Sequence, residues 1–377
     1  MKLVFYTNYL NHHQVLVADE LYRLLGDEFH FVTTLPCDEK EMKGGADYSL
    51  RPYCILAGES CESYQSALRL ARDADVCVFG ACSQTYAVER AKYNPHGLSF
   101  EMAERRLKHR WMTIGSPVFR QWLWNYYRYF RKANFHELCC SSFASTDDMK
   151  LCAYNGRHYK WGYFTIVPEN YMRSDGHTGK TIRLMWCARF IYWKHPELAI
   201  HLAVRLKELG YEFHVDMYGD GVLRPVIEQL SKELNVADYI TFYGNVANSQ
   251  IHTAMRNHDI FLFTSDRLEG WGAVANEAMS NGCVLVASDA IGSTHYLVTH
   301  KETGMIFRSG DLDSLYEQVK YLLDNPEERK RISMCGWESM IKLWSPANAA
   351  KNLLQLIEDI QAGREASIAE GPCSIAL

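Results

Sequence analysis

Hydrophobic and polar positions follow a repeating order in the first half of the chain. Short apolar runs predict buried strands, and apolar positions spaced three and four residues apart predict amphipathic helices. The expected strands are Lys2–Tyr6, Phe29–Thr33, Val76–Gly80 and Leu138–Ser141, and the expected helices are Gln14–Leu25, Tyr64–Arg72 and Ser145–Tyr154. Strands that alternate with helices predict a parallel sheet covered on both faces.

The pattern changes near residues 168–180, where Pro168, Gly176 and Gly179 lie among polar residues and predict a linker between domains. A second alternating series follows. Its expected strands are Thr181–Cys187, Glu212–Tyr218, Tyr239–Tyr243, Ile260–Thr264 and Val284–Ala287. Its expected helices lie near Pro196–Leu209, Leu223–Leu234, Ser249–Arg256, Gly272–Ser280, Leu312–Leu323, Glu327–Leu343 and Ala347–Ile360. The tail after Ala362 has no periodicity and is expected to be frayed.

Two such series predict an α/β protein with two Rossmann-like, doubly wound parallel-sheet domains. The length of 377 residues suits this number of domains. We expect domains at residues 1–170 and 180–344, with the helix in 345–362 packing back on the first domain. Because ligands bind such sheets at the carboxyl ends of the strands, the chemistry is expected in the cleft between the domains.

Composition narrows the class of protein. The chain has 40 basic and 45 acidic residues, and the net charge of −5 argues against a nucleic-acid-binding protein. Its 12 cysteines contain no C-x-x-C pair, which indicates reduced thiols in a cytosolic protein. No apolar stretch reaches the roughly 18 residues of a membrane span. A cytoplasmic location is expected, with contact to the inner face of the cell membrane left open.

Two glutamates and two glycines stand out between a predicted strand and a predicted helix. Glu269 lies in a loop with Gly270 and Gly272, and Glu277 lies in the helix that follows. Helix N-termini favour phosphate groups, and two carboxylates accept hydrogen bonds from sugar hydroxyls. A nucleotide sugar offers both groups, so the segment predicts a donor site of this class.

The same segment resembles a motif of family 4 retaining glycosyltransferases with the GT-B fold, including bacterial capsule and exopolysaccharide transferases. The chain reads Glu269-Gly270-Trp271-Gly272 and carries Glu277 at the spacing of the family's second glutamate. The resemblance implies that Glu269 contacts hydroxyls of the donor sugar and acts in catalysis. It implies that Glu277 contacts the ribose and that the Gly-Trp-Gly run lies in the donor site.

A second segment, Ala188–Ala199, resembles the family's Gly-Arg and Lys-Gly positions. The resemblance implies that Arg189 and Lys194 neutralise the donor diphosphate while its bond to the sugar breaks, which suits fixed cations. It therefore implies that neither a metal nor a cofactor is needed. The chain departs from the family by having Ala188 before the arginine and His195 after the lysine, which puts the shape of the phosphate pocket in doubt.

Two further segments match the family pattern after consecutive strands. Tyr218–Gly221 places Gly219 in the donor site, and Phe242–Val246 places Val246 near the nucleobase. Gly219 and Gly221 do not form a dinucleotide-binding fingerprint, because the third glycine of that motif is missing.

In the first domain, the loop Asn8–Gln14 contains His12 and His13 at the carboxyl end of a strand. These histidines are candidates for action on the acceptor or the phosphate, and an ordinary polar loop with a helix cap is the alternative. The loop and Glu104 resemble a subgroup of bacterial capsule and exopolysaccharide transferases. Many relatives carry a histidine that faces the donor sugar, but the corresponding loop here, Gly80–Gln84, has none.

Residues 105–136 contain six Arg, two Lys and no acidic residue, with Trp and Tyr side chains interleaved. This composition suits an anionic membrane surface close to a polyprenyl-diphosphate-linked acceptor. A packed helical pair with a basic solvent face is an open alternative, and nucleic acid is disfavoured. Asp73-Ala-Asp75 and Asp311-Leu-Asp313 imitate the metal-binding motif of other transferases and are expected to be structural.

The resemblance covers roughly residues 1–345 and implies a retaining glycosyltransferase. The second domain would bind the nucleotide sugar and the first a glycan or lipid-linked acceptor, in the synthesis of a cell-surface polysaccharide. Two alternatives stay open: a sugar-nucleotide epimerase or hydrolase with the same fold, and a non-catalytic, membrane-associated binding protein.

Overall fold

The computed structural model describes residues 1–35, 49–171 and 181–376. The chain forms two compact units. The first contains Met1–Thr165 and Leu343–Leu377, and the second contains Ile166–Lys342. Gly176 and Gly179, which were expected in the linker, lie outside the described residues.

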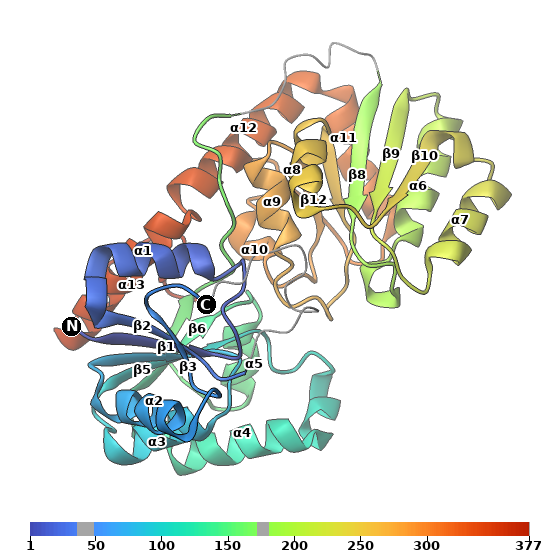
Figure 1. The fold of residues 1–377 in the computed structure, drawn as a ribbon. Helices are drawn as coiled ribbons and strands as arrows, with labels where there is room; N and C mark the ends of the chain where they lie inside the picture. Colours follow the sequence, from blue (N-terminus) through green and yellow to red (C-terminus); the bar gives the residue numbers. More distant parts are fainter. Residues whose placement is uncertain (36–48, 172–180, 377) are drawn as a thin grey trace. The chain divides into compact units, whose positions relative to one another are not determined.

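The first unit is built on a seven-stranded parallel sheet with the strand order β3-β2-β1-β4-β5-β6-β7 (Figure 1). Its strands are β1 (Leu3–Thr7), β2 (Phe29–Thr33), β3 (Cys54–Leu56), β4 (Val76–Phe79), β5 (Leu98–Ala103), β6 (Phe135–Cys139) and β7 (His158–Lys160). Its helices are α1 (Val15–Leu25), α2 (Cys61–Asp73), α3 (Thr85–Tyr93), α4 (Pro117–Arg128), α5 (Ala144–Lys150) and α13 (Pro346–Gln361).

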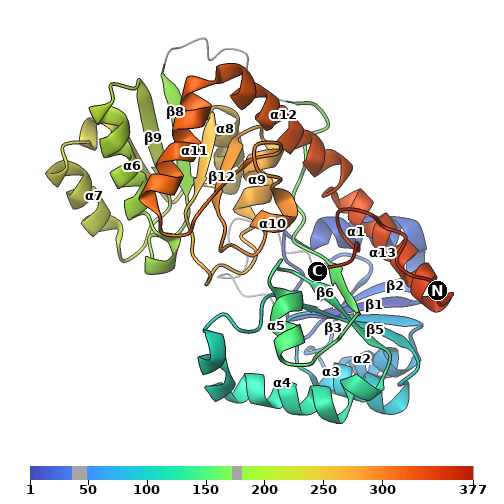
Figure 2. The same ribbon diagram turned by 180° about the vertical axis from the view of Figure 1, so that it is seen from behind.

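Alternating side chains of the buried strands supply two apolar layers. Val4 and Tyr6 share a core with residues of α2, α3 and α4 on one face of the sheet. Phe5 packs on Phe29 and Phe31 on the other face, where α1 and α13 lie side by side (Figures 1 and 2). Burial of both faces explains why these strands read as nearly continuous apolar runs.

The second unit has a six-stranded parallel sheet with the order β10-β9-β8-β11-β12-β13. Its strands are β8 (Ile182–Cys187), β9 (Phe213–Tyr218), β10 (Ile240–Gly244), β11 (Ile260–Phe263), β12 (Val284–Ser288) and β13 (Met305–Phe307). Its helices are α6 (Glu197–Glu208), α7 (Arg224–Glu233), α8 (Asn248–Arg256), α9 (Val274–Ser280), α10 (Thr294–Leu297), α11 (Leu312–Asp324) and α12 (Pro326–Lys342). Residues of α6, α7 and α11 share one core with the sheet, and α8 and α9 cover the opposite face (Figures 1 and 2).

The predicted fold class is confirmed, since both sheets are parallel and carry helices on both faces. The sequence pattern missed four strands: β3, β5, β7 and β13. Three of these have only three residues, which is too short for an alternation to be recognised. The fourth, β5, carries the charged Glu101 within its run, and tertiary contacts of that carboxylate override the local signal.

The expectation of a frayed tail after Ala362 is wrong. Cys373 and Ala376 are buried, and Ile375 pairs with Tyr159 of β7 as an antiparallel bridge. The tail thus covers the edge strand β7, whose unpaired backbone groups would otherwise face solvent. The pattern missed this because one short extended segment beside another carries no periodic signal.

Both pairs of aspartates that imitate a metal motif have structural roles. The carboxylate of Asp311 caps α11 by accepting a hydrogen bond from the backbone of Ser314 at 2.9 Å. The carboxylate of Asp75 accepts one from the backbone of Lys2 at 2.7 Å. Among the helices of the described residues, none combines the length and the apolar character needed to cross a membrane.

Candidate functional site

The order of strands in the second unit defines where a ligand binds. Chain order reverses between β8 and β11, which are neighbours in the sheet. The connections that leave these two strands run in opposite directions, so a crevice opens at their carboxyl ends. The segments that follow β8 and β11 carry Arg189, Lys194 and Glu269, so three predicted site residues lie at this point.

Lys194 and Glu269 form an ion pair, with the ammonium of Lys194 donating to Oε2 of Glu269. Each side chain is 12% exposed, so the pair is largely shielded from water. The hydroxyl of Thr264 donates to the carbonyl of Lys194 at 2.6 Å, and the backbone of Asp266 donates to that of Trp193 at 2.9 Å. These bonds fix the two loops against each other and hold the opposite charges in place.

Gly272 and Trp271 shape the loop after Glu269 in different ways. Gly272 has a φ of 77°, and a Cβ there would lie 2.3 Å from the ring of Phe263, so no larger residue fits this turn. The helix α9 begins at Val274, two residues later than expected. The ring of Trp271 is fully buried, and its Nε1 donates to Oδ1 of Asn276 at 2.8 Å, so this side chain braces the loop from inside.

Glu277 lies on α9 and is 8% exposed. Its Oε1 is 3.7 Å from Nε2 of His252 on α8. Burial raises the pKa of the Cys187 thiol to about 12, with the charge of Glu277 raising it further and that of Lys194 lowering it. Glu277 lies on the helix that directly follows the loop carrying Glu269.

Arg189 is exposed, and its guanidinium lies 5.7 Å from the centre of the Trp193 ring. Such a cation–π contact limits the directions in which the guanidinium points. Arg189 thus remains accessible to a ligand, unlike the ion-paired Lys194.

The departure from the family pattern at His195 is accommodated by the backbone. His195 has φ 49° and ψ 55°, a left-handed conformation that glycine adopts more readily. Its ring lies between Glu197, at 2.7 Å, and Asp266, at 3.4 Å. The hydrogen bond with Glu197 is the main cause of a raised pKa for this imidazole. These contacts hold the imidazole against the two loops.

Gly219 allows the turn after β9 to touch the segment after β8. Its φ is 115°, and a Cβ would lie 2.0 Å from the carbonyl oxygen of Ala188. The backbone of Phe190 donates to Asp220 at 2.9 Å, and that of Gly219 donates to Gly244 at 2.7 Å. The turns after three neighbouring strands are therefore joined through backbone groups.

A shallow hollow of about 420 Å³ lies beside these turns. It is lined by Tyr218, Tyr243 and Val246 together with residues of α8. The two tyrosine rings stack with centroids 4.6 Å apart and 6° between their planes, and Tyr243 is 46% exposed. Exposed aromatic faces suit the stacking of a planar base. Val246 was predicted near the nucleobase from the sequence, whereas the two tyrosines, which occur in the same two segments, were not predicted.

The first unit contains a larger cavity of about 590 Å³. Its wall includes residues that follow β1, β4 and β5, among them the loop Gly80–Gln84 and the charged residues Glu101, Glu104, Arg105 and Arg106. Since β1 and β4 are neighbours with opposite connections, this cavity occupies the switch point of the first sheet.

Of the predicted residues in this unit, Glu104 lines the cavity, whereas His12 and His13 are not among the described residues of its wall. His13 packs on Tyr163 with ring centroids 5.5 Å apart, and Tyr163 donates to Glu104 at 2.8 Å. Burial lowers the pKa of His13 to about 3, with His12 as the smaller cause. The ring of His13 therefore stacks in its neutral form on Tyr163, which does line the cavity.

Arg106, in the wall of this cavity, belongs to a charge cluster that the sequence pattern did not predict. The guanidinium of Arg106 stacks on Trp122 at 3.9 Å. It forms ion pairs with Glu101 at 3.2 Å, Glu137 at 3.4 Å and Asp148 at 2.9 Å. One signal was available, because Glu137 lies in the middle of a strand that is otherwise buried and largely apolar.

Comparison with known proteins agrees with this geometry. Residues 168–336 match the family model of glycosyl transferases group 1. The matched stretch lies within the second unit, which contains the crevice with Lys194 and Glu269.

Relatives of known name match shorter stretches. The putative glycosyltransferase EpsF of Bacillus subtilis is 35% identical over 104 residues, which are 28% of this chain and 26% of EpsF. The alpha-D-kanosaminyltransferase of Streptomyces kanamyceticus is 28% identical over 180 residues, 48% of this chain and 44% of that protein. In both cases the match spans less than half of the relative's length.

One solved structure extends the comparison to the fold of nearly the whole chain. HepE of Anabaena, solved in complex with UDP, matches with a TM-score of 0.70 and 14% identity. The match covers 95% of this chain and 100% of HepE. The chain therefore has the GT-B fold of two Rossmann-like domains.

Proposed function

We propose that this protein is a glycosyltransferase that moves a sugar from a nucleotide-sugar donor to an acceptor, with the donor bound by the second unit. The observation that carries the proposal is the Lys194–Glu269 ion pair at the switch point of the sheet. A carboxylate for sugar hydroxyls and a cation for a diphosphate are held side by side there.

The same geometry suggests how the reaction proceeds. The leaving diphosphate gains negative charge as the glycosidic bond breaks, and Lys194 and Arg189 would stabilise that charge. Glu269 would accept hydrogen bonds from donor hydroxyls. In a retaining reaction the acceptor hydroxyl attacks on the face that the diphosphate leaves, and a departing phosphate oxygen takes its proton. We propose that this stabilisation needs no metal ion and no cofactor.

The rest of the donor has a place in the same unit. The hollow at Tyr243 and Val246 suits the nucleobase, because a flat base can stack on the exposed ring. Glu277 is proposed to hold the ribose hydroxyls, since its buried carboxylate lies on α9, the helix that follows the loop of Glu269.

A thermal-shift screen against UDP, GDP, ADP, TDP and their common sugars tests the donor class, with and without EDTA. One nucleotide is expected to raise the melting temperature, because a ligand that binds only the folded state stabilises it. Glu277→Ala should weaken binding of that nucleotide roughly 10-fold or more, as expected for losing a hydrogen bond to a charged group. Glu317→Ala, on α11, is a matched control that should bind normally.

The outcomes separate the candidate functions. Unchanged affinity in Glu277→Ala would remove this residue from the ribose site. No response to any nucleotide would contradict the donor site and favour a binding protein. Donor breakdown or isomerisation without an acceptor would favour a hydrolase or epimerase.

We propose that the acceptor is a glycan or a polyprenyl-diphosphate-linked sugar bound in the cavity of the first unit. Glu104 lines this cavity and suits sugar hydroxyls, since its carboxylate accepts hydrogen bonds. Such an acceptor would place the enzyme in the synthesis of a capsule or another cell-surface polysaccharide, at the cytoplasmic side of the membrane.

The surface of residues 105–136 supports the membrane part of this proposal. Arg105 and Arg106 are turned inward, whereas Trp111, Met112 and Trp124 are more than half exposed. The exposed basic residues around them are Arg110, Arg120, Arg128, Arg131 and Lys132. Aromatic side chains within a basic surface are typical of proteins that bind anionic lipid head groups.

Sedimentation with vesicles tests this surface. The protein is expected to bind vesicles that contain phosphatidylglycerol and to be released by salt, because part of the attraction is electrostatic. Replacing both Trp111 and Trp124 with Ser should lower binding roughly 10-fold or more, since each ring contributes apolar burial. Equal binding by the variant would contradict membrane contact through this surface.

A further inference from the structure

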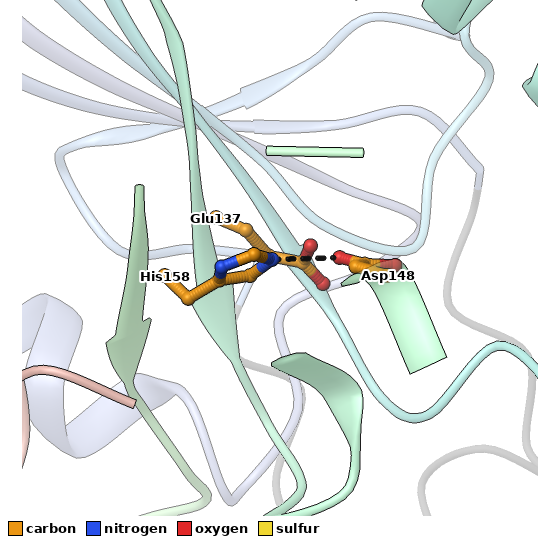
Figure 3. Close-up of side chains that lie close together, drawn as sticks. All are labelled: Glu137, Asp148 and His158. Carbon is orange, nitrogen blue, oxygen red and sulfur yellow. Dashed lines mark ion pairs between the residues drawn. The ribbon is translucent and has the colours of Figure 1, made fainter. Parts of the chain in front are cut away.

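Three side chains of the first unit converge at one buried point (Figure 3). They are Glu137 of β6, Asp148 of α5 and His158 of β7. One potential ligand atom from each lies within 4.8 Å of the others. Glu137 and Asp148 are fully buried, and His158 is 5% exposed.

The facing atoms of this cluster are not satisfied by hydrogen bonds. Neither Oε1 nor Oε2 of Glu137 has a hydrogen-bond partner among the described residues, and the same holds for Oδ2 of Asp148 and Nε2 of His158. Buried polar atoms nearly always have partners. Oε1 of Glu137 has only an ion-pair contact with Arg106 at 3.4 Å, and Oδ2 of Asp148 only one with Nε2 of His158 at 3.5 Å, so the hydrogen-bonding capacity of these buried atoms is left open to a bound ligand.

The charges of the cluster do not balance. Arg106 is the guanidinium that pairs with Glu101, Glu137 and Asp148. Its Nε holds Oδ1 of Asp148 at 2.9 Å, which leaves Oδ2 turned toward His158. The fully buried Glu137 and Asp148 and the partly buried Glu101 share this one guanidinium, and buried charge without full compensation is strongly unfavourable.

The geometry suits a metal ion better than a direct contact. Nε2 of His158 and Oδ2 of Asp148 are 3.5 Å apart, which is long for a hydrogen bond. Two ligands at roughly 2.0–2.2 Å from a tetrahedral ion lie about 3.4 Å apart. Imidazole nitrogen with carboxylate oxygens favours Zn²⁺ and related transition metals over Ca²⁺ and Mg²⁺.

We propose that Glu137, Asp148 and His158 bind one divalent transition-metal ion of the Zn²⁺ type, as a structural site of the first unit. The ion would join β6, α5 and the edge strand β7, and would hold the carboxylate that orients Arg106 in the wall of the cavity. This site is separate from the donor crevice and does not depend on the proposed reaction.

Metal content of the purified full-length chain tests the proposal. After dialysis against metal-free buffer, elemental analysis should find a stoichiometric transition metal, or the protein should take up Co²⁺ with the visible absorption of a low-coordinate site. His158→Gln should bind Co²⁺ at least about tenfold more weakly. Asp147→Asn is the matched control: it breaks the neighbouring buried ion pair with Arg105 but leaves all three ligands, so it should keep the metal.

Two further measurements keep the test decisive. If His158→Gln does not fold, Glu137→Gln retains the side-chain volume, and a chelator should lower the melting temperature of the unmodified chain. Thiolate ligands give a sulfur-to-cobalt charge-transfer band, so its absence excludes binding by cysteines. A folded chain that is metal-free and unaffected by Zn²⁺ or Co²⁺, or a His158→Gln variant with unchanged affinity, overturns the proposal and leaves protonation to balance the charge.

Discussion

Replacing Lys194 with alanine should lower kcat/KM roughly 10²–10³-fold, comparable to the loss of one fixed group that stabilises transition-state charge. The physical reason is the position of its ammonium, which the carbonyl contact with Thr264 and the ion pair with Glu269 fix in the crevice. The charge on the leaving diphosphate develops only as the bond breaks, so most of the loss should appear in kcat. Initial rates with saturating donor and acceptor give kcat.

The matched control for this experiment is Lys232→Ala. Lys232 lies on the exposed surface of α7 in the same unit, so its removal changes the net charge equally without touching the crevice. A Lys194→Ala enzyme with unchanged kcat would contradict the assignment of the diphosphate to this residue. A rise in KM alone would indicate that Lys194 binds the donor without favouring the transition state.

Gly219→Ala should destabilise the second unit by about 2–5 kcal/mol, from roughly 1–2 for the unfavourable φ and 1–3 for overpacking. The added methyl group would lie 2.0 Å from the carbonyl oxygen of Ala188. Because that contact is with backbone, relief requires the turn after β9 to move away from the segment that carries Arg189. Donor binding should therefore weaken together with stability. Urea unfolding and nucleotide titration measure the two effects.

Gly210→Ala separates the strain from the clash. Gly210 follows α6 with a φ of 75°, and nothing lies within 4 Å of a Cβ built there. Only the cost of the left-handed backbone applies, about 1–2 kcal/mol, and donor binding should be unchanged. Equal destabilisation by the two substitutions would show that the close approach of Gly219 to Ala188 does not contribute to the loss of stability.

Local patterns in the sequence were sufficient to predict the class of fold. Short apolar runs such as Phe29–Thr33 and Ile260–Phe263 mark strands that are buried on both faces, and this signal needs no tertiary information. Glu269, Gly272 and Glu277 could also be predicted as site residues, because glycines and carboxylates between a strand and a helix suit phosphate groups and sugar hydroxyls. These features are encoded within single elements, and the sequence alone reveals them.

Short edge elements carried no such information. The strand β7 and the tail that pairs with it through Ile375 have too few residues for periodicity. Their conformation is set by backbone hydrogen bonds to each other, so it depends on the rest of the sheet being in place. For the same reason, the basic stretch of residues 105–136 could not be divided from sequence into the inward Arg105 and Arg106 and the outward Arg120 and Arg128.

The sequence by itself determined the two parallel-sheet units and the residues suited to a nucleotide sugar. Tertiary structure alone decided which of them meet. Lys194 and Glu269 are 75 residues apart and pair because β8 and β11 are neighbours in the sheet. Glu137, Asp148 and His158 converge because β6, α5 and β7 do. The chemistry of a side chain is set by its own residue type. The distance between two side chains depends on strand order, which no single segment of the sequence specifies.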